Sequence, residues 1–271
     1  MCKRRLEERA RVAYNTILYS ESARIATITL NRADKRNAIS YELIDDLIAA
    51  LKQAAASAAQ VVILTGAGKA FCSGMDLDNL KGLTGRTNEQ NLKDSETMAS
   101  LFRTLYDFPK PTIAAVNGPA IAGGTGLATL CDFTLAVPEA KFGYTEVRIG
   151  FVPAIVSGFL IANIGEKRAR DLLLTGRIFG AEEALKLGLV NEIVAPEQLM
   201  ARAQELAGQL LENSPASLQA TKKLLSSYTR EQLDRQVKQA VQGNAAIRQT
   251  ADFKEGITAF LEKRKPTWTG K

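Results

Sequence analysis

Apolar and polar positions in the first part of the chain switch between a strand pattern and a helical one. Residues 15–20 (NTILYS) and 23–31 (ARIATITLN) are rich in β-branched side chains, and the ES dipeptide between them predicts a β-hairpin. Residues 40–56 place apolar side chains at helical spacing behind Ser40, a suitable N-cap. The pattern therefore predicts a hairpin followed by an amphipathic helix.

Strands and helices continue to alternate up to about residue 137. The short apolar stretches 60–66, 111–118 and 132–138 predict buried strands, and an amphipathic helix over 88–108 separates the first two. Pro109 and Pro111 would end that helix. Alternation of this kind predicts an α/β fold with parallel strand pairing.

The second part of the chain is predicted to be mainly helical. Short helices are expected at 166–176 and 180–190, with a strand-like link over 190–194. Four successive helices are then predicted, over 195–213, 214–228, 229–243 and 250–265. The chain thus divides into a predicted α/β core over residues 1–195 and a helical C-terminal region over residues 196–271.

The composition of the chain excludes several kinds of catalytic and metal site. The chain has no histidine, which removes Ser-His-Asp and Cys-His catalysis and histidine-ligated metal sites. The three cysteines, Cys2, Cys72 and Cys131, have no metal or redox spacing and fit a reduced, cytoplasmic setting. No secretory signal and no membrane-spanning stretch is expected. The net charge of +6 favours an anionic partner, and the scattered basic residues speak for a phosphorylated small molecule over nucleic acid.

Two glycine-bearing segments, 61–77 and 111–128, carry the most specific pattern. Neither is a dinucleotide fingerprint, because Phe71 and Thr129 stand where the third glycine belongs. Neither is a P-loop, because Gly124 stands where the lysine must be. Both segments place a buried strand before a glycine-bearing turn. If the strands are parallel neighbours, both turns lie at the carboxyl edge of the sheet, and each can offer one backbone N–H to a single oxygen, as an oxyanion hole requires.

Four segments in register resemble successive signatures of the crotonase superfamily, the enoyl-CoA hydratase/isomerase family. They are AFCSGMDL (70–77), AAVNGPAIAGGTGLATLCDFTLA (114–136), KFGYTEVRIGFVP (141–153) and LTGRIFGAEEALKLGLVNEIV (174–194). The resemblance covers about residues 14–265. It implies a repeated ββα spiral core with a helical C-terminal region that assembles the chain into a homotrimer or homohexamer. It also implies an acyl-CoA thioester as substrate, and no metal or cofactor beyond the CoA of that substrate.

The resemblance further assigns roles to individual residues. The oxyanion donors would be the backbone N–H groups of Met75 and Gly123, and Glu146 would be the acid/base. The acyl group would lie against Ala122, Gly124 and Gly126. CoA would be bound by Arg32, Arg36, Cys72, Gly74, Asp76 and Leu77 and, from a neighbouring subunit, by Phe260 and Lys263.

Gly126 departs from the family's hydratase pattern. Hydratases of this family hold water between two glutamates; Glu146 matches the second, and the first falls at Gly126. Position 126 follows Gly123 by three residues, so both lie on one face of a helix. A glycine there offers no acid, and is expected to leave open space for a bulkier acyl group or for water. The alternative is that the backbone packs too closely for a side chain.

The choice of reaction is therefore open. A single glutamate can move a proton between two carbons of an enoyl-CoA and so shift its double bond, whereas hydration normally uses both acids. Branched or dicarboxylic substrates such as methylglutaconyl-CoA are compatible with the expected space. Asp76 or Asp78 could replace the missing acid. Outside enzymology, the alternatives are a non-catalytic CoA-binding protein or an RNA-binding protein.

Overall fold

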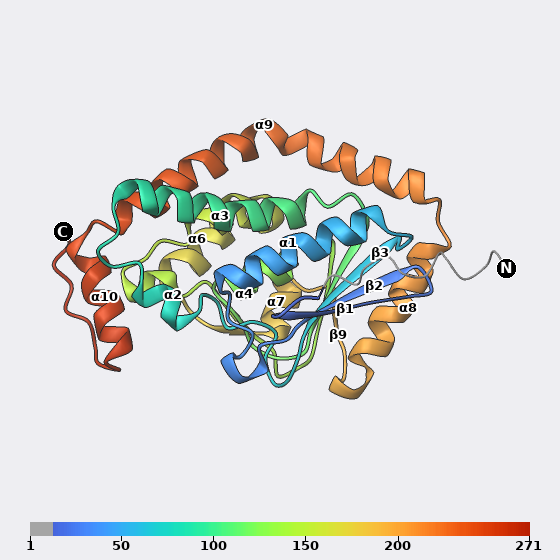
Figure 1. Ribbon diagram of the computed structural model, residues 1–271, viewed down its shortest axis with the longest axis horizontal. Helices are drawn as coiled ribbons and strands as arrows, with labels where there is room; N and C mark the ends of the chain where they lie inside the picture. Colours follow the sequence, from blue (N-terminus) through green and yellow to red (C-terminus); the bar gives the residue numbers. More distant parts are fainter. Residues whose placement is uncertain (1–12) are drawn as a thin grey trace.

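A computed structural model describes residues 13–271, and its centre is a six-stranded sheet (Figure 1). In spatial order the strands are β1 (Ile17–Ser22), β2 (Ile25–Leu30), β3 (Val61–Gly66), β4 (Thr112–Val116), β6 (Phe133–Ala136) and β9 (Glu192–Ile193). The first two form the predicted antiparallel hairpin, and the remaining pairs are parallel. The predicted α/β class with parallel pairing is confirmed.

A second, smaller sheet is formed by three strands that follow β4 in the sequence. It contains β5 (Ala120–Ile121), β7 (Lys141–Gly143) and β8 (Phe179–Gly180). Short helical segments follow its strands: α4 (Gly123–Thr129) after β5, η2 (Glu146–Ile149) after β7 and α7 (Ala181–Leu187) after β8. The small sheet therefore positions both Gly123 and Glu146.

The helix predicted behind Ser40 is α1 (Tyr41–Ala56), and the Ser40 hydroxyl accepts a hydrogen bond from the Leu43 N–H. Its apolar face is buried against β1 and β2, and α3 (Asn88–Tyr106) packs beside it in the same hydrophobic core. The other helical segments up to residue 211 are η1 (Ala33–Lys35), α2 (Leu77–Lys81), α5 (Ala154–Ile164), α6 (Glu166–Thr175), η3 (Pro196–Gln198) and α8 (Leu199–Leu211). Within residues 13–271 no helix is both long and apolar enough to cross a membrane.

The two glycine-bearing turns are neighbours, as predicted. β3 and β4 pair in parallel with Val62 opposite Thr112, so the segments that follow them leave the same edge of the sheet. Cys72 and Ala120, one in each of these segments, form a parallel bridge. The turns are therefore joined to each other by backbone hydrogen bonds and not only placed side by side.

The C-terminal region differs from the prediction in one respect. The helices expected over 214–228 and 229–243 are one continuous helix, α9 (Pro215–Ile247). No glycine or proline occurs between Pro215 and Gly243, so nothing in the backbone ends the helix near Thr229. Figure 1 shows α9 running over α3 to the end of the molecule where α10 (Ala251–Leu261) lies. The domain boundary at residue 195 stays a prediction.

Two of the three cysteines lie in the described part of the chain. Cys72 and Cys131 are free and buried, and burial raises the pKa of each thiol to about 12. Both therefore remain protonated thiols near neutral pH and are packing residues. Cys2 lies outside the described residues.

Candidate active site

A pocket of about 1040 Å³ lies where the two glycine-bearing turns meet. Met75 lines it from the first turn and Gly123 from the second, with Glu146 from η2. Apolar walls come from Phe102 on α3 and Val156 on α5. The pocket therefore brings two backbone segments and the Glu146 carboxylate together beside apolar walls.

The backbone N–H groups of Met75 and Gly123 have no hydrogen-bond acceptor among residues 13–271. The reason at Met75 is the local bridge: the Ile39 N–H donates to the Gly74 carbonyl at 2.7 Å, and the Asp76 N–H donates to the Ile39 carbonyl at 2.9 Å. This pairing turns the Met75 N–H away from Ile39. Gly123 is the first residue of α4, where backbone N–H groups lack an intrahelical partner. Both donors are free to bind a substrate oxygen.

Glycine at position 124 is required by close backbone packing. The Ile121 N–H donates to the Cys72 carbonyl at 2.9 Å, and a Cβ on Gly124 would lie 2.1 Å from that same oxygen. Gly74 has φ +87°, and Ala122 is held at φ +51° directly before Gly123. A non-glycine residue at such a φ is strained, and here the strain sits beside an expected oxyanion donor.

Thr125 connects this turn to the strand that precedes Glu146. Its hydroxyl lies 2.6 Å from the Ala120 carbonyl and 3.0 Å from the Gly143 carbonyl. The Ala122 N–H also donates to the Gly143 carbonyl, at 2.7 Å. Gly143 ends β7 three residues before Glu146. The donor turn and the carboxylate are thereby held in a fixed relation.

Glu146 begins η2, and its Oε2 atom is buried without a hydrogen-bond partner among residues 13–271. Burial raises the pKa of this carboxyl from 4.5 to about 7, opposed only in part by the residue's own backbone N–H. A carboxyl that ionises near neutral pH can both take up and release a proton under physiological conditions. Glu146 therefore has the environment of a general acid/base.

The expected open space at Gly126 is absent. A Cβ on Gly126 would lie 2.8 Å from Cγ1 of Val156 and 3.2 Å from Cε1 of Phe102, and Gly126 does not line the pocket. The expectation of space was wrong because side chains from α3 and α5 already fill it. The alternative, a glycine required by close packing, is the one that the structure supports.

We expect Gly126→Glu to destabilise the protein by about 1–3 kcal/mol and to add no hydratase activity, because even the Cβ has no room. The double variant Gly126→Glu/Val156→Ala removes the nearest obstructing atom and should recover part of the lost stability. Denaturant unfolding and an enoyl-CoA hydration assay measure both effects. A stable Gly126→Glu protein with increased hydration would contradict this packing.

The two acids suggested as replacements for the missing glutamate both line the pocket, but Asp76 is structural. Arg32 forms an ion pair with Asp76 at 2.8 Å, and Asp76 caps α2 by accepting from the Asp78 N–H at 2.9 Å. Burial alone would raise the pKa of Asp76, but the Asp78 amide and the Arg32 guanidinium lower it overall. Asp76 is thus held ionised and is a poor proton donor. Asp78 is exposed.

The structure brings most of the other predicted site residues to the pocket. The lining includes Arg36, Asp76, Leu77, Ala122, Phe260 and Lys263. It does not include Arg32, Cys72, Gly74, Gly124 or Gly126. Four of these support the turns instead: Arg32 binds Asp76, Cys72 and Gly124 pack against each other, and Gly74 shapes the bend before Met75. Gly126 lies in α4 against Phe102 and Val156.

The expected contact of Phe260 and Lys263 with CoA in a neighbouring subunit stays a prediction; within their own chain both residues line the pocket. The reason is the course of the C-terminus. Residues of α10 pack on η2, and Gly256 approaches the Ile149 backbone so closely that a Cβ would lie 2.3 Å from its carbonyl oxygen. This contact folds α10 back over the pocket.

The pocket also contains residues that sequence reasoning did not single out. Phe102 and Val156 close the space beside Gly126, and Phe151, Asn244 and Arg248 form another part of the wall. Phe102 lies on the apolar face of a predicted helix, where an aromatic residue is expected to pack in the hydrophobic core. Only the long-range packing of α3, α5 and α9 assigns these side chains to the pocket.

Comparisons with known proteins agree with this geometry. The enoyl-CoA hydratase/isomerase family model matches residues 20–271. The chain is 46% identical over 247 residues to a Thermus thermophilus protein named as an enoyl-CoA hydratase, covering 91% of this chain and 98% of that protein. It is 34% identical over 250 residues to the 1,2-epoxyphenylacetyl-CoA isomerase of Escherichia coli, covering 91% and 95% of the two chains.

A solved structure shares the whole architecture. The enoyl-CoA hydratase/isomerase from Xanthobacter autotrophicus Py2 superposes with a TM-score of 0.85 at 31% identity, covering 93% of this chain and 98% of that one. The fold and the pocket thus define an acyl-CoA enzyme with a crotonase-type α/β core. The chain belongs to the enoyl-CoA hydratase/isomerase family, and it is a hydratase or an isomerase.

Proposed function

We propose that this enzyme is an enoyl-CoA isomerase that uses Glu146 as its single acid/base group. The observation that carries the proposal is the packing around Gly126. Phe102 and Val156 occupy the place of a second carboxylate, while Glu146 keeps a buried oxygen without a hydrogen-bond partner in the described part of the chain and a pKa of about 7. One carboxylate is sufficient to relocate a proton, and hydration is normally a task for two.

The mechanism moves one proton and no other atom. Glu146 takes a proton from C2 of a 3-enoyl-CoA, and the electron pair delocalises into the thioester oxygen to form a dienolate. The N–H groups of Met75 and Gly123 donate to that oxygen, each with a contribution of about 3–4 kcal/mol to lowering the barrier. Protonated Glu146 then returns the proton to C4, which leaves the double bond between C2 and C3.

Hydration is the second candidate, because relatives named as hydratases include the 46% identical one. In this reaction Glu146 would take a proton from water while the hydroxyl adds to C3, and would return it to C2. One carboxylate would perform this more slowly than two, since nothing else orients the water. A hydratase of branched substrates such as methylglutaconyl-CoA remains within this candidate.

Activity should rise with pH. The isomerase needs Glu146 ionised in the free enzyme, and its pKa is raised from 4.5 to about 7. We therefore expect kcat/KM for a 3-enoyl-CoA to be low at pH 5, half-maximal near pH 7 and constant above pH 8. Initial rates in buffers of constant ionic strength measure this profile. A rate that is already at its plateau at pH 5 would show that Glu146 has an ordinary pKa.

Product identification tests the proposal. The enzyme is incubated separately with 3-hexenoyl-CoA and 2-hexenoyl-CoA, and the products are separated by chromatography and identified by mass. The proposal predicts conversion of 3-hexenoyl-CoA to 2-hexenoyl-CoA. An enzyme that leaves 3-hexenoyl-CoA unchanged and forms 3-hydroxyhexanoyl-CoA from the other substrate is a hydratase.

The proposal also covers the CoA-binding side chains, the cofactor requirement, the oligomeric state and the cellular compartment. Lys35, Arg36 and Lys263 line the pocket with exposed side chains and suit the phosphates of CoA. The reaction needs no cofactor beyond the CoA of its substrate. Leu224, Leu225 and Tyr228 on α9 are exposed and would be covered in a homotrimer or homohexamer. We place the enzyme in the cytoplasm, where CoA thioesters are metabolised and thiols stay reduced.

A further inference from the structure

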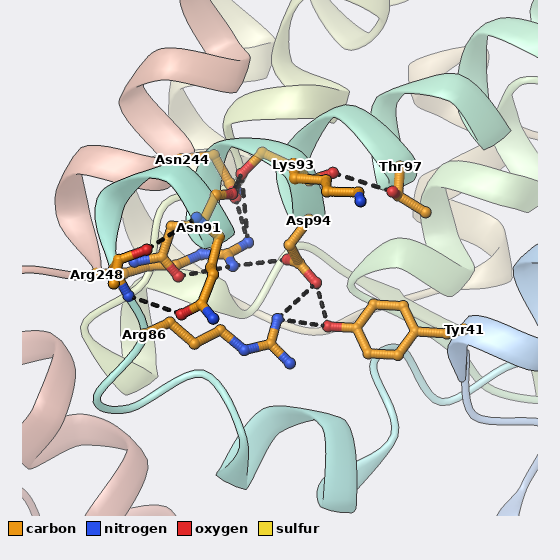
Figure 2. Close-up of polar contacts among 11 residues, drawn as sticks. Tyr41, Arg86, Asn91, Lys93, Asp94, Thr97, Asn244 and Arg248 are labelled. Atoms are coloured by element: carbon orange, nitrogen blue, oxygen red, sulfur yellow. Dashed lines mark hydrogen bonds and ion pairs between the residues drawn. The ribbon is translucent and has the colours of Figure 1, made fainter.

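A largely buried polar cluster, whose contacts are drawn in Figure 2, adjoins the pocket. We define it as Tyr41, Arg86, Asn91, Asp94, Ser95, Asn244 and Arg248. Two members, Asn244 and Arg248, line the pocket itself. Polar groups are costly to bury, so their arrangement requires an explanation.

Arg248 is the centre of the cluster. Its side chain is 1% exposed, and Nη1 lies 2.6 Å from Oδ2 of Asp94. Nη2 donates to Oδ1 of Asn244 at 2.7 Å and to Oγ of Ser95 at 3.4 Å. The ring of Phe151 stacks on the guanidinium, with Cζ 5.2 Å from the ring centre. Contacts on several sides therefore fix the orientation of this group.

The cluster is left with unpaired donors. Nε of Arg248 and Nδ2 of Asn91 are buried and have no acceptor among residues 13–271. Leaving a buried donor unpaired destabilises the folded protein, and the cost is greater when the group is charged. Oδ2 of Asp94 also lacks a hydrogen bond among residues 13–271, but it lies 2.6 Å from Nη1 of Arg248 in their ion pair. The groups left without any partner are therefore donors, and the missing partner is an acceptor.

The cluster also carries excess positive charge. Asp94 is the one carboxylate within it, and both Arg248 and Arg86 pair with that group, at 2.6 and 3.2 Å. Two guanidinium groups against one carboxylate leave a net charge of +1. In a buried setting this charge favours an anion over a neutral acceptor.

The position of the cluster fits the far end of an acyl chain. Asp94, Met98 and Phe102 are spaced four residues apart and share one face of α3. Phe102 lies beside Gly123, and Met98 lines the pocket one turn further along. Asp94 is eight residues from Phe102, about 12 Å along the helix axis. A chain held by its thioester at Gly123 can thus extend along α3 towards Arg248.

We propose that the pocket takes acyl-CoA thioesters whose acyl chain ends in a carboxylate, and that Arg248 recognises this carboxylate. The inference rests on the proposed function for the orientation of the thioester. It does not rest on space at Gly126, which is filled. Nε of Arg248 supplies the free donor, and the excess charge of the cluster supplies the preference for an anion over a methyl group.

Binding of unreactive substrate analogues tests this directly. Dissociation constants are measured by calorimetry for glutaryl-, adipoyl- and suberyl-CoA, each against the unsubstituted acyl-CoA of equal carbon number and against its methyl ester. We expect at least one carboxylate to bind about tenfold or more tightly than both of its neutral partners. If none of the three does so, the inference is overturned.

Two variants identify the residue responsible. Arg248→Met should reduce the ratio of the dissociation constant of the neutral analogue to that of the carboxylate analogue to about one. Arg86→Met should reduce this ratio in part, because the substitution removes the excess charge but keeps the Arg248 donor. Arg235→Met is the matched control on α9, where Arg235 pairs with Glu231 at the surface, and it should keep the full ratio. A full ratio in a folded Arg248→Met protein would also contradict the assignment.

The outcome is separable from that of the proposed function. Saturated analogues report binding whether or not the enzyme isomerises anything. Turnover of 3-hexenoyl-CoA without any carboxylate preference in binding would remove the inference and leave the proposed function standing. A carboxylate preference without isomerisation of either 3-hexenoyl-CoA or its ω-carboxy analogue would do the reverse.

Discussion

Replacing Glu146 by glutamine is expected to lower kcat for 3-enoyl-CoA isomerisation about 1000-fold, with little change in KM. Glutamine keeps the size and the hydrogen-bonding shape of the side chain but cannot take up the C2 proton. Substrate binding depends on the oxyanion donors and the CoA contacts, which are on other residues. Steady-state kinetics on the purified variant measure both constants, and a kcat within tenfold of the wild type would exclude Glu146 as the base.

The same variant should be more stable than the wild type at alkaline pH. Below about pH 4.5 the carboxyl is protonated in both the folded and the unfolded chain, and above about pH 7 it is ionised in both. Between these values the folded state binds more protons, so wild-type stability falls as the pH rises. A glutamine side chain does not ionise, so the stability of the variant does not fall with pH for this reason. Denaturant unfolding should therefore give Glu146→Gln the higher free energy of unfolding at pH 8, and a difference near zero at pH 4.

Gly124→Ala is expected to be the most damaging substitution of a residue that does not line the pocket. The new Cβ would lie 2.1 Å from the Cys72 carbonyl oxygen, so the two turns must move apart. A displacement of about 1 Å between catalytic groups can cost 100-fold in rate. We expect kcat to fall by about that factor, with a loss of about 2–4 kcal/mol in unfolding free energy.

Gly208→Ala is the matched control for this substitution. Gly208 lies in α8, and a Cβ there meets no atom within 4 Å. Alanine should stabilise the helix by about 0.5–1 kcal/mol and leave kcat unchanged. If Gly124→Ala behaves like Gly208→Ala, the close approach of the two turns is not what positions the oxyanion donors.

Local patterns were enough to predict much of the fold and the general location of the site. The β-branched residues of the hairpin, the Ser40 cap and the buried strands act over a few residues, and all are found where expected. The convergence of the glycine turns also follows from a local pattern, because parallel neighbours place their carboxyl ends at one edge. The enoyl-CoA family then followed from motifs in these turns.

The details that decide the chemistry are long-range and could not be predicted in this way. Gly126 is enclosed by Phe102 and Val156, which come from two other helices. The helix carrying Val156 was not predicted, because an almost wholly apolar segment has no polar face to reveal its period. Arg248 meets Asn91 across 157 residues of chain. No local pattern indicates such contacts.

One measurement tests the central claim, that a single carboxylate makes this enzyme an isomerase. The enzyme is given 3-hexenoyl-CoA in water enriched in oxygen-18, and the products are followed by mass spectrometry from the first turnover. Isomerisation leaves the mass unchanged, whereas hydration adds one labelled oxygen at C3. We expect 2-hexenoyl-CoA to form at an initial rate at least about 100-fold above that of the labelled hydroxyacyl-CoA. Labelled product forming from 2-hexenoyl-CoA faster than 3-hexenoyl-CoA is isomerised would contradict the account.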